Sequence, residues 1–189
     1  MNRRRFLLLV AGGAVLTAGA PAAADAALWA RLRAGGLVVL VRHAATEPGV
    51  GDPPGFRLDD CTTQRNLSPA GRAQAQHLAA VFARERVPVA RVLSSEWCRC
   101  RDTANLAFGA YEVWPALNNV FGRPQNASTQ TVAILERAGA FAGSGNLVLV
   151  THGSVIGPVA GVGAVQGELV LMRPAGTGRL ELVGRLLPD

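Results

Sequence analysis

The sequence contains no lysine: all nineteen basic residues among its 189 are arginines. Aromatic residues make up only 5% of the chain, which argues against a platform that stacks nucleic-acid bases. The arginines are spread along the chain rather than clustered, so a nucleic-acid partner is not indicated. Because a guanidinium group matches the geometry of phosphate and carboxylate, the arginines favour a small anionic substrate instead.

Cysteine is also scarce, and the three residues are Cys61, Cys98 and Cys100. The last two lack the Cys-x-x-Cys spacing of redox proteins, and no histidine lies nearby in the sequence, so neither redox chemistry nor a metal site is expected. An oxidising compartment allows three cysteines to form one disulfide. We expect Cys61 to pair with Cys98 or Cys100, and buried free thiols are the alternative.

The N-terminal residues resemble a targeting signal rather than a segment of the folded domain. Three arginines, Arg3 to Arg5, precede an apolar stretch that ends in small residues near position 24, which is typical of a secretory signal. Arg3-Arg4-x-Phe6-Leu7 resembles the twin-arginine export motif. We expect residues 1–26 to be removed on export, and a retained membrane anchor is the alternative. Residues 27–189 would then form one domain, periplasmic or secreted, without a stable membrane span.

Hydrophobic patterning in the remaining chain predicts alternating strands and helices. Continuous aliphatic runs at 37–41 and 146–151 are typical of strands buried on both faces, as in parallel sheets. Shorter strands are expected at 91–95 and 111–114. Helices are expected at 26–34, at 70–86 with Ser68 as N-cap and Pro69 following, at 96–108 before Gly109, and from a Ser128 cap to about 138.

The last part of the chain has a different pattern. Residues 168–173 and 179–186 alternate in polarity around a Gly-Thr-Gly turn, which predicts an antiparallel hairpin at a sheet edge. The whole pattern predicts an α/β fold with three α/β/α layers, a mostly parallel central sheet and an antiparallel C-terminal edge hairpin. Residues 44–66, rich in glycine and proline, are expected to form a long loop of functional importance.

Polar residues come directly after three of the four expected buried strands. His43 and His152 each come straight after an aliphatic strand, and Ser94-Ser95 ends another. Ligands of α/β sheets bind at the carboxyl ends of strands, so we expect these residues to converge in one site. The third histidine, His77, lies within an expected helix and is interpreted as a surface residue.

Four motifs, in order, carry a resemblance to a known family. They are Arg42-His43-Ala44-x-Thr46, the helix start Leu67-Ser68-Pro69-Ala70-Gly71-Arg72-Ala73-Gln74-Ala75, Ser94-Ser95-x-x-x-Arg99-x-x-x-Thr103-Ala104, and Val150-Thr151-His152-Gly153. Each motif alone is weak, but the ordered set over residues 37–157 is similar to the histidine phosphatase superfamily. The resemblance implies the phosphoglycerate-mutase-like fold and, with the expected signal, a small exported member.

The resemblance also implies roles. His43 would attack phosphorus and form a phosphohistidine, while Arg42, Arg99 and His152 bind the phosphoryl oxygens and Thr46 adds a hydroxyl to the substrate site. The motif register selects Arg99 rather than Arg101. Because the arginines stabilise the charge, neither a metal nor another cofactor is expected.

The chain departs from the family at the general acid. Many members carry a glutamate where this sequence has Asn118 and Asn119, and an amide cannot protonate a leaving group. Five carboxyl residues could substitute, or none: Glu47, Asp52, Asp59, Asp60 and Glu96. If none does, the site favours good leaving groups, such as phosphoanhydrides, phosphohistidine or phenolic esters.

The sequence therefore predicts an exported phosphatase that acts on a small phosphorylated compound. One alternative is a phosphate- or phosphosugar-binding protein on the same scaffold without turnover. Another is a mutase or phosphotransferase, which the absence of the usual acid disfavours. Neither the physiological substrate nor the oligomeric state can be deduced from the sequence.

Overall fold

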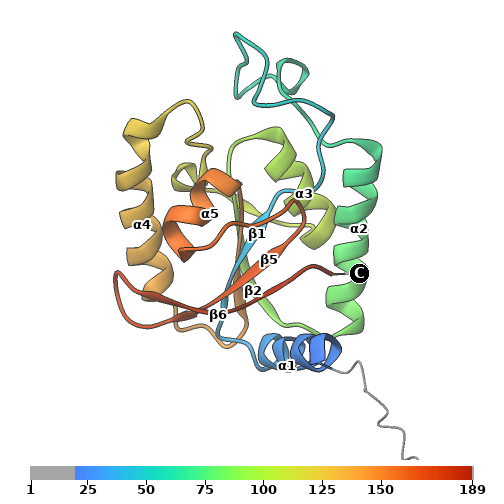
Figure 1. Cartoon of the computed structure of the whole chain (residues 1–189), viewed down its shortest axis with the longest axis vertical. Helices are drawn as coiled ribbons and strands as arrows, with labels where there is room; N and C mark the ends of the chain where they lie inside the picture. Colours follow the sequence, from blue (N-terminus) through green and yellow to red (C-terminus); the bar gives the residue numbers. More distant parts are fainter. Residues whose placement is uncertain (1–19, 189) are drawn as a thin grey trace, which may run out of the picture.

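The computed structural model describes residues 20–188, so most of the segment expected to be an export signal lies outside the described residues. Within that range six strands form one sheet, in the order β3-β2-β4-β1-β5-β6 (Figure 1). The strands are β1 (Val38–Arg42), β2 (Val89–Ser94), β3 (Glu112–Val113), β4 (Asn146–Thr151), β5 (Leu169–Pro174) and β6 (Leu180–Leu186). The first four run parallel, and β5 and β6 form an antiparallel edge hairpin, as predicted.

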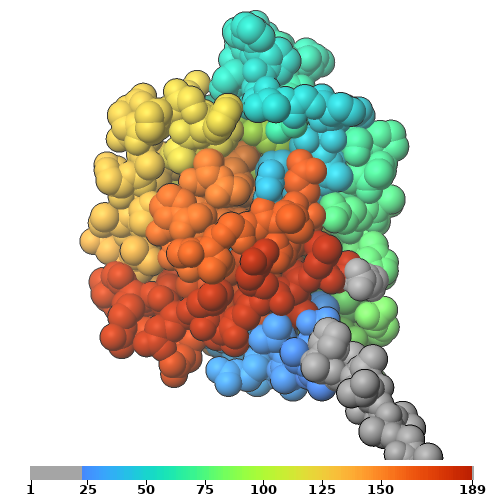
Figure 2. Space-filling view, viewed as in Figure 1, coloured from blue at the N-terminus to red at the C-terminus, as the bar shows by residue number. Residues whose placement is uncertain are grey.

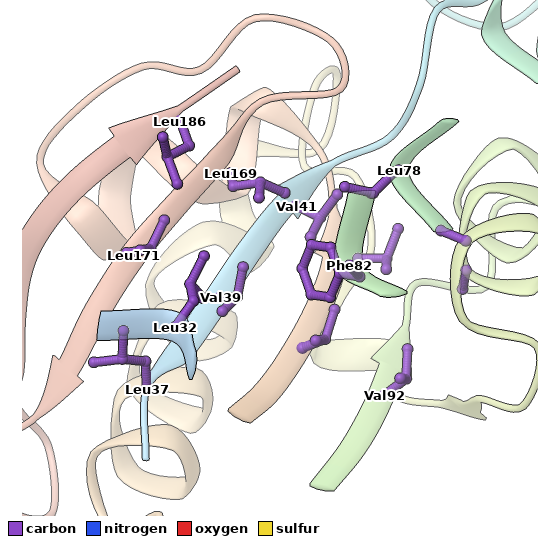
Figure 3. Close-up of a cluster of buried hydrophobic side chains, with 14 of the residues drawn as sticks. Leu32, Leu37, Val39, Val41, Leu78, Phe82, Val92, Leu169, Leu171 and Leu186 are labelled. Carbon is purple, nitrogen blue, oxygen red and sulfur yellow. The ribbon is translucent and has the colours of Figure 1, made fainter. Parts of the chain in front are cut away.

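Alternate residues of the central strands face two separate cores. In β1, Val39 and Val41 point to one cluster, and Val38 and Leu40 point to the other. This alternation reflects the two-residue period of a strand, and an aliphatic residue at every position buries both faces. Figure 3 shows the first cluster, in which Val39 and Val41 meet side chains from the surrounding helices and strands.

The helices cover both faces of the sheet. Their bounds are α1 (Ala20–Ala34), α2 (Pro69–Arg84), α3 (Cys98–Phe108), α4 (Ala127–Gly139) and α5 (Gly153–Ala160). Residues of α1, α2 and α3 pack in the first cluster, and residues of α4 and α5 pack in the second. The predicted three-layer α/β/α architecture is confirmed. None of the helices within residues 20–188 is long and apolar enough to cross a membrane.

Several predicted boundaries are confirmed and others are wrong. Ser68 caps α2 through its side chain, with Pro69 in the first turn, and Gly109 ends α3. The first helix begins at Ala20 rather than at residue 26. Ser128 is not a cap, because a 3₁₀ turn at Pro124–Asn126 leads directly into α4 from Ala127.

The helix α5 was not predicted from the sequence. Its eight residues include two glycines and Pro158, which disfavour a helix interior. The apolar side chains of Val155, Ile156 and Val159 are buried in the second cluster, and this packing outweighs the weak intrinsic propensity. The helix starts at Gly153, directly after His152. It therefore fixes the direction in which the backbone continues after β4.

Gly71, in the second motif, allows a close approach of two backbone segments. A Cβ atom built on Gly71 would lie 1.8 Å from the carbonyl oxygen of Ala45. The first turn of α2 therefore packs directly against the backbone that comes after β1, at a distance only glycine allows. This contact sets the position of α2 relative to the end of β1.

The long segment between β1 and α2 projects at one end of the molecule, in cyan at the top of Figures 1 and 2. Apart from a 3₁₀ turn at Cys61–Thr63 and isolated bridges it is irregular, as predicted. Cys61 is disulfide-bonded to Cys98, and Cys100 is a buried free cysteine. The side chain of Gln64 also accepts a hydrogen bond of 3.0 Å from the backbone N–H of Cys98. The loop is thus joined to the start of α3.

Reduction of the Cys61–Cys98 disulfide is expected to lower the free energy of unfolding by about 4 kcal/mol, from the loop-closure entropy of the 37-residue separation. Urea titration with and without a dithiol reductant measures the difference. The double variant Cys61→Ser/Cys98→Ser should show the same loss without reductant, and Cys100→Ser should remain sensitive to reductant. A wild-type protein that titrates with three free thiols would contradict the assignment.

Candidate active site

The parallel register of β1 and β4 brings two histidines together. Arg42 pairs with Thr151 across the two strands, and the backbone N–H of His43 donates to the carbonyl of Thr151 at 3.0 Å. The rings of His43 and His152 consequently lie with their centroids 5.3 Å apart. On the other side of β4, the backbone N–H of Ser95 donates to Val150 at 3.0 Å. The three strand ends therefore meet, as expected from the sequence.

A cavity of about 880 Å³ opens at these strand ends. Four of its lining residues are those expected from the motifs, Arg42, His43, Arg99 and His152, and Thr46 lines it as well. The hydroxyl oxygen of Thr46 accepts a hydrogen bond of 3.1 Å from Gln166. A second depression, of about 570 Å³, lies between α2, α3 and β2 and is lined by none of the residues expected in the site.

Three arginines line the cavity rather than two. Arg42 donates to the carbonyl of Ala164 at 2.7 Å through Nη1. Arg65, which the sequence motifs did not identify, lines the same cavity. Among the residues the structure describes, four buried side-chain polar atoms lack a hydrogen-bond partner, and three of them are the Nε atoms of Arg42, Arg65 and Arg99. Unpartnered buried donors are rare, and their concentration here indicates a site for an anion.

Asp52 holds Arg99 in place. The carboxylate of Asp52 accepts from Arg99 Nη1 at 2.6 Å and from Arg99 Nη2 at 3.2 Å, and both side chains are almost fully buried, with 3% and 2% exposed. It also accepts from Trp97 Nε1 at 2.9 Å and from the backbone N–H of Arg65 at 3.1 Å. Burial alone would raise the pKa of Asp52, but these bonds and the charge of Arg99 hold it below its usual value.

His43 is a neutral imidazole whose hydrogen lies on Nδ1. Its Nδ1 lies 2.9 Å from the carbonyl oxygen of Ala44, which can only accept, so Nδ1 carries the hydrogen and Nε2 carries the lone pair. Burial, followed by the positive charges of Arg99, Arg42 and Arg65, lowers the pKa of His43 to about 3 although the Ala44 bond favours protonation. The ring is therefore neutral near pH 7.

His152 is neutral as well and lies deeper in the protein. Burial, with the charges of its neighbours, places its pKa well below the usual value. Its Nε2 is 2.9 Å from Ser95 Oγ and 3.3 Å from Cys100 Sγ. Burial raises the pKa of the Cys100 thiol to about 12, so Cys100 is a protonated neighbour of His152 rather than a thiolate.

The five carboxylates considered as substitute acids occupy different places. Asp52 is committed to Arg99 and Trp97. Asp59 and Asp60 contact Arg57 and lie outside the cavity lining, as does Glu96, which accepts a hydrogen bond from Asn118 at 2.5 Å. Glu47 lines the cavity from the exposed loop, and it is the sole carboxylate among the lining residues.

Of the remaining residues considered in the sequence, some lie on the surface and one lines the cavity. His77 is exposed, as predicted. Arg101 is exposed and donates to the hydroxyl of Tyr111 at 3.2 Å, away from the cavity. Asn119 lines the cavity, whereas Asn118 does not. Within residues 20–188 no three histidine, cysteine or carboxylate side chains gather closely enough to hold a metal ion.

The two buried histidines predict a pH dependence of stability. A folded-state pKa of His43 near 3, against 6.5 for a free histidine, means that between these values the unfolded chain binds a proton that the folded chain does not. The free energy of unfolding should therefore fall as the pH falls below 6.5, by up to about 1.4 kcal/mol per pH unit for each histidine. Urea titrations between pH 7 and 5 measure this slope. The His43→Asn variant should show a shallower slope, and an equal slope would contradict the assignment.

Comparisons with known proteins identify a family for the chain. The family model described as histidine phosphatase superfamily, branch 1, matches residues 38–133. No curated protein sequence is similar enough to count as a relative.

Solved structures with the same fold include three at low sequence identity. The protein histidine phosphatase SixA complexed with tungstate is 15% identical, with a TM-score of 0.55, and the match covers 80% of this chain and 97% of SixA. Rv3214 from Mycobacterium tuberculosis is 18% identical, with a TM-score of 0.58 and coverage of 80% and 96%. The mycobacterial glucosyl-3-phosphoglycerate phosphatase Rv2419c, in complex with VO₃, is 18% identical, with a TM-score of 0.50 and coverage of 77% and 97%.

Proposed function

The chain belongs to the histidine phosphatase superfamily, and on that premise we propose that it is an exported phosphatase that transfers a phosphoryl group to His43 and then to water. The observation that carries the proposal is the cluster of three guanidinium groups around a neutral histidine. Arg42, Arg65 and Arg99 all line the cavity that His43 lines, and each has a buried Nε–H without an acceptor. An anionic phosphorylated substrate supplies the acceptors that these donors lack.

The first step forms the covalent intermediate. The Nε2 lone pair of His43 attacks phosphorus, the N–P bond forms, and the bond to the leaving oxygen breaks with its electron pair going to that oxygen. The backbone carbonyl of Ala44 keeps Nδ1 protonated, so it stabilises the positive charge that develops on the ring. Arg42 and Arg99 stabilise the equatorial oxygens, and Thr46, which also lines the cavity, offers a hydroxyl.

The second step releases phosphate. A water molecule attacks phosphorus, the N–P bond breaks and its electron pair returns to Nε2, which leaves a neutral His43 and dihydrogen phosphate. The low pKa of His43 makes its imidazole a good leaving group for this step, because the neutral ring is the favoured form in this environment. His152, held by Ser95 and neutral, offers a further contact to the phosphoryl group. In this proposal the arginines supply the charge stabilisation, and the reaction proceeds without a metal.

The ligands of the two related structures support the choice of chemistry. SixA is described with tungstate and Rv2419c with VO₃, and both ligands are oxyanions. Oxyanions of this size resemble the phosphoryl group that Arg42 and Arg99 would bind here.

Export is part of the proposal and rests on separate features. The Cys61–Cys98 disulfide is stable in an oxidising compartment, such as the periplasm or the exterior of the cell. The arginines at positions 3 and 4 and the apolar stretch after them match an export signal. Leu28 and Leu32 of α1 pack in the first core cluster, so removal of residues 1–26 would leave these contacts intact.

Hydrolysis of p-nitrophenyl phosphate by residues 27–189 in EDTA tests the proposal. Turnover in EDTA supports a metal-independent phosphatase, and loss of turnover on metal removal would refute that part. If nothing is hydrolysed while inorganic phosphate still raises the melting temperature, the chain is instead a phosphate-binding protein. Transfer of the phosphoryl group to an added alcohol in preference to water would identify a phosphotransferase.

A further inference from the structure

Arg65 adds a third guanidinium group to the lining of the cavity. Its Nη1 donates to the carbonyl oxygen of Gly49, in the exposed loop that projects at the end of the molecule (Figure 2). The backbone of Arg65 is fixed from the other side, because its N–H donates to Asp52 and its carbonyl oxygen accepts from Arg99 at 3.4 Å. The Nε–H of Arg65 is buried and has no acceptor. The loop therefore presents a third guanidinium, next to the pair beside His43, that is ready to bind an anion.

The amide side of the cavity carries no proton donor for a leaving group. Asn119 lines the cavity, and its side-chain oxygen accepts hydrogen bonds from Ser154 Oγ at 2.7 Å and from the backbone N–H of Phe121 at 3.1 Å. Asn118 is turned to Ser95, with 3.2 Å between Oδ1 and Oγ. Neither amide can release a proton, and Glu47, the sole carboxylate of the lining, lies on the exposed loop. A leaving group that departs beside the amides must therefore be stable as an anion.

We propose that the substrate is a phosphoanhydride, whose terminal phosphoryl group is transferred to His43 while Arg65 binds the second phosphate. This inference rests on the proposed function and specifies the substrate class of the same site. A phosphoanhydride accounts for both the free donor of Arg65 and the amides that stand in place of an acid. A leaving phosphate needs no acid, but it does need a cation to stabilise its charge. An aryl phosphate would also leave without an acid, but it brings no anionic group for Arg65 to bind before the bond breaks.

The step is balanced without a further reactant. His43 Nε2 forms a bond to the terminal phosphorus, and the bridging P–O bond breaks with its electrons going to the oxygen of the second phosphate. That group leaves as a phosphate dianion, because the second pKa of a phosphate monoester is roughly 6. Arg65 stabilises the charge that moves onto the bridging oxygen. Water then releases the transferred phosphoryl group from His43 as dihydrogen phosphate.

A matched pair of nucleotides tests the substrate class. AMP and ADP share the nucleoside, but AMP can lose phosphate only from an alkyl ester, whereas ADP can lose it from an anhydride. We expect kcat/KM for ADP to exceed that for AMP at least 100-fold. In Arg65→Gln the ratio of kcat/KM for ADP to that for p-nitrophenyl phosphate should fall at least tenfold. Arg57→Gln, an exposed arginine of the same loop outside the cavity lining, is the matched control and should leave the ratio unchanged.

The outcomes separate this inference from the proposed function. Turnover of p-nitrophenyl phosphate with no preference for ADP over AMP overturns the substrate class alone. An equal loss on ADP and p-nitrophenyl phosphate in Arg65→Gln shows that Arg65 binds the transferred phosphoryl group, and also overturns it. No turnover of any substrate overturns the proposed function and this inference together. The variant Glu47→Gln adds a check, because Glu47 is the sole carboxylate among the lining residues. A selective loss of AMP hydrolysis in this variant would identify Glu47 as an acid for alkyl leaving groups and contradict the argument.

Discussion

Replacing His43 with alanine is expected to reduce the turnover of p-nitrophenyl phosphate by a factor on the order of 10³ or more. The residual cations of Arg42, Arg65 and Arg99 would still bind the substrate, but no group in the cavity would replace the nucleophilic Nε2. We therefore expect kcat to fall far more than KM changes. Steady-state kinetics on both proteins measure the two effects separately.

The covalent intermediate gives this prediction a second readout. When the wild-type chain is quenched in alkali during turnover of a ³²P-labelled substrate, it should carry acid-labile label, and His43→Ala should carry none. His77→Ala is the matched control, because His77 is exposed on α2 and lines no part of the cavity. A His43→Ala protein that keeps both turnover and label would refute the phosphohistidine route.

The fold and much of the site are predictable from the sequence for a simple physical reason. Aliphatic runs such as 37–41 are typical of strands that are buried on both faces, as in a parallel sheet, and the register of neighbouring strands then fixes the positions of the residues at their carboxyl ends. Because Arg42 pairs with Thr151, His43 and His152 have to lie side by side. The order of the motifs along the chain is thus enough to place these side chains at one edge of the sheet.

The parts of the site that the sequence did not reveal depend on the path of the loop. Asp52 could be named only as one of five candidate acids, and Arg65 was not singled out at all. Neither residue comes directly after a strand, and their positions are set by contacts across the fold, including the Cys61–Cys98 disulfide and the bond from Cys98 to Gln64. Arg65 stands two residues before Leu67, where the second motif begins, and this nearness to a motif is the signal in the sequence that could have suggested it.

The missed helix α5 and the incorrect Ser128 cap have a common cause. In both places the surrounding structure outweighs the intrinsic preferences of the residues. Pro158 and the glycines of α5 are tolerated because Ile156 and Val159 are buried, and Ser128 is not needed as a cap because a 3₁₀ turn precedes α4. Local propensity is a weak guide where packing contributes more free energy.

Removing the carboxylate of Asp52 is expected to have the largest effect on stability. Asp52→Ala leaves the guanidinium of Arg99 buried, at 2% exposed, without its charge partner, and breaking one side of a buried ion pair costs about 3–5 kcal/mol. The change also takes an acceptor from Trp97 Nε1 and from the backbone N–H of Arg65. Urea titration of the variant beside the wild type measures the loss.

The same loop offers a control that isolates burial as the cause. Asp59 is 86% exposed and contacts Arg57 at 3.8 Å, so Asp59→Ala removes an equal charge where water screens it, and the unfolding midpoint should not change. Inorganic phosphate provides a further readout, since an anion that binds the cluster of Arg42, Arg65 and Arg99 supplies the charge that Asp52→Ala lacks. Phosphate should therefore raise the midpoint of Asp52→Ala more than that of the wild type. If the two midpoints rise equally, Arg99 does not share its guanidinium between Asp52 and the bound anion.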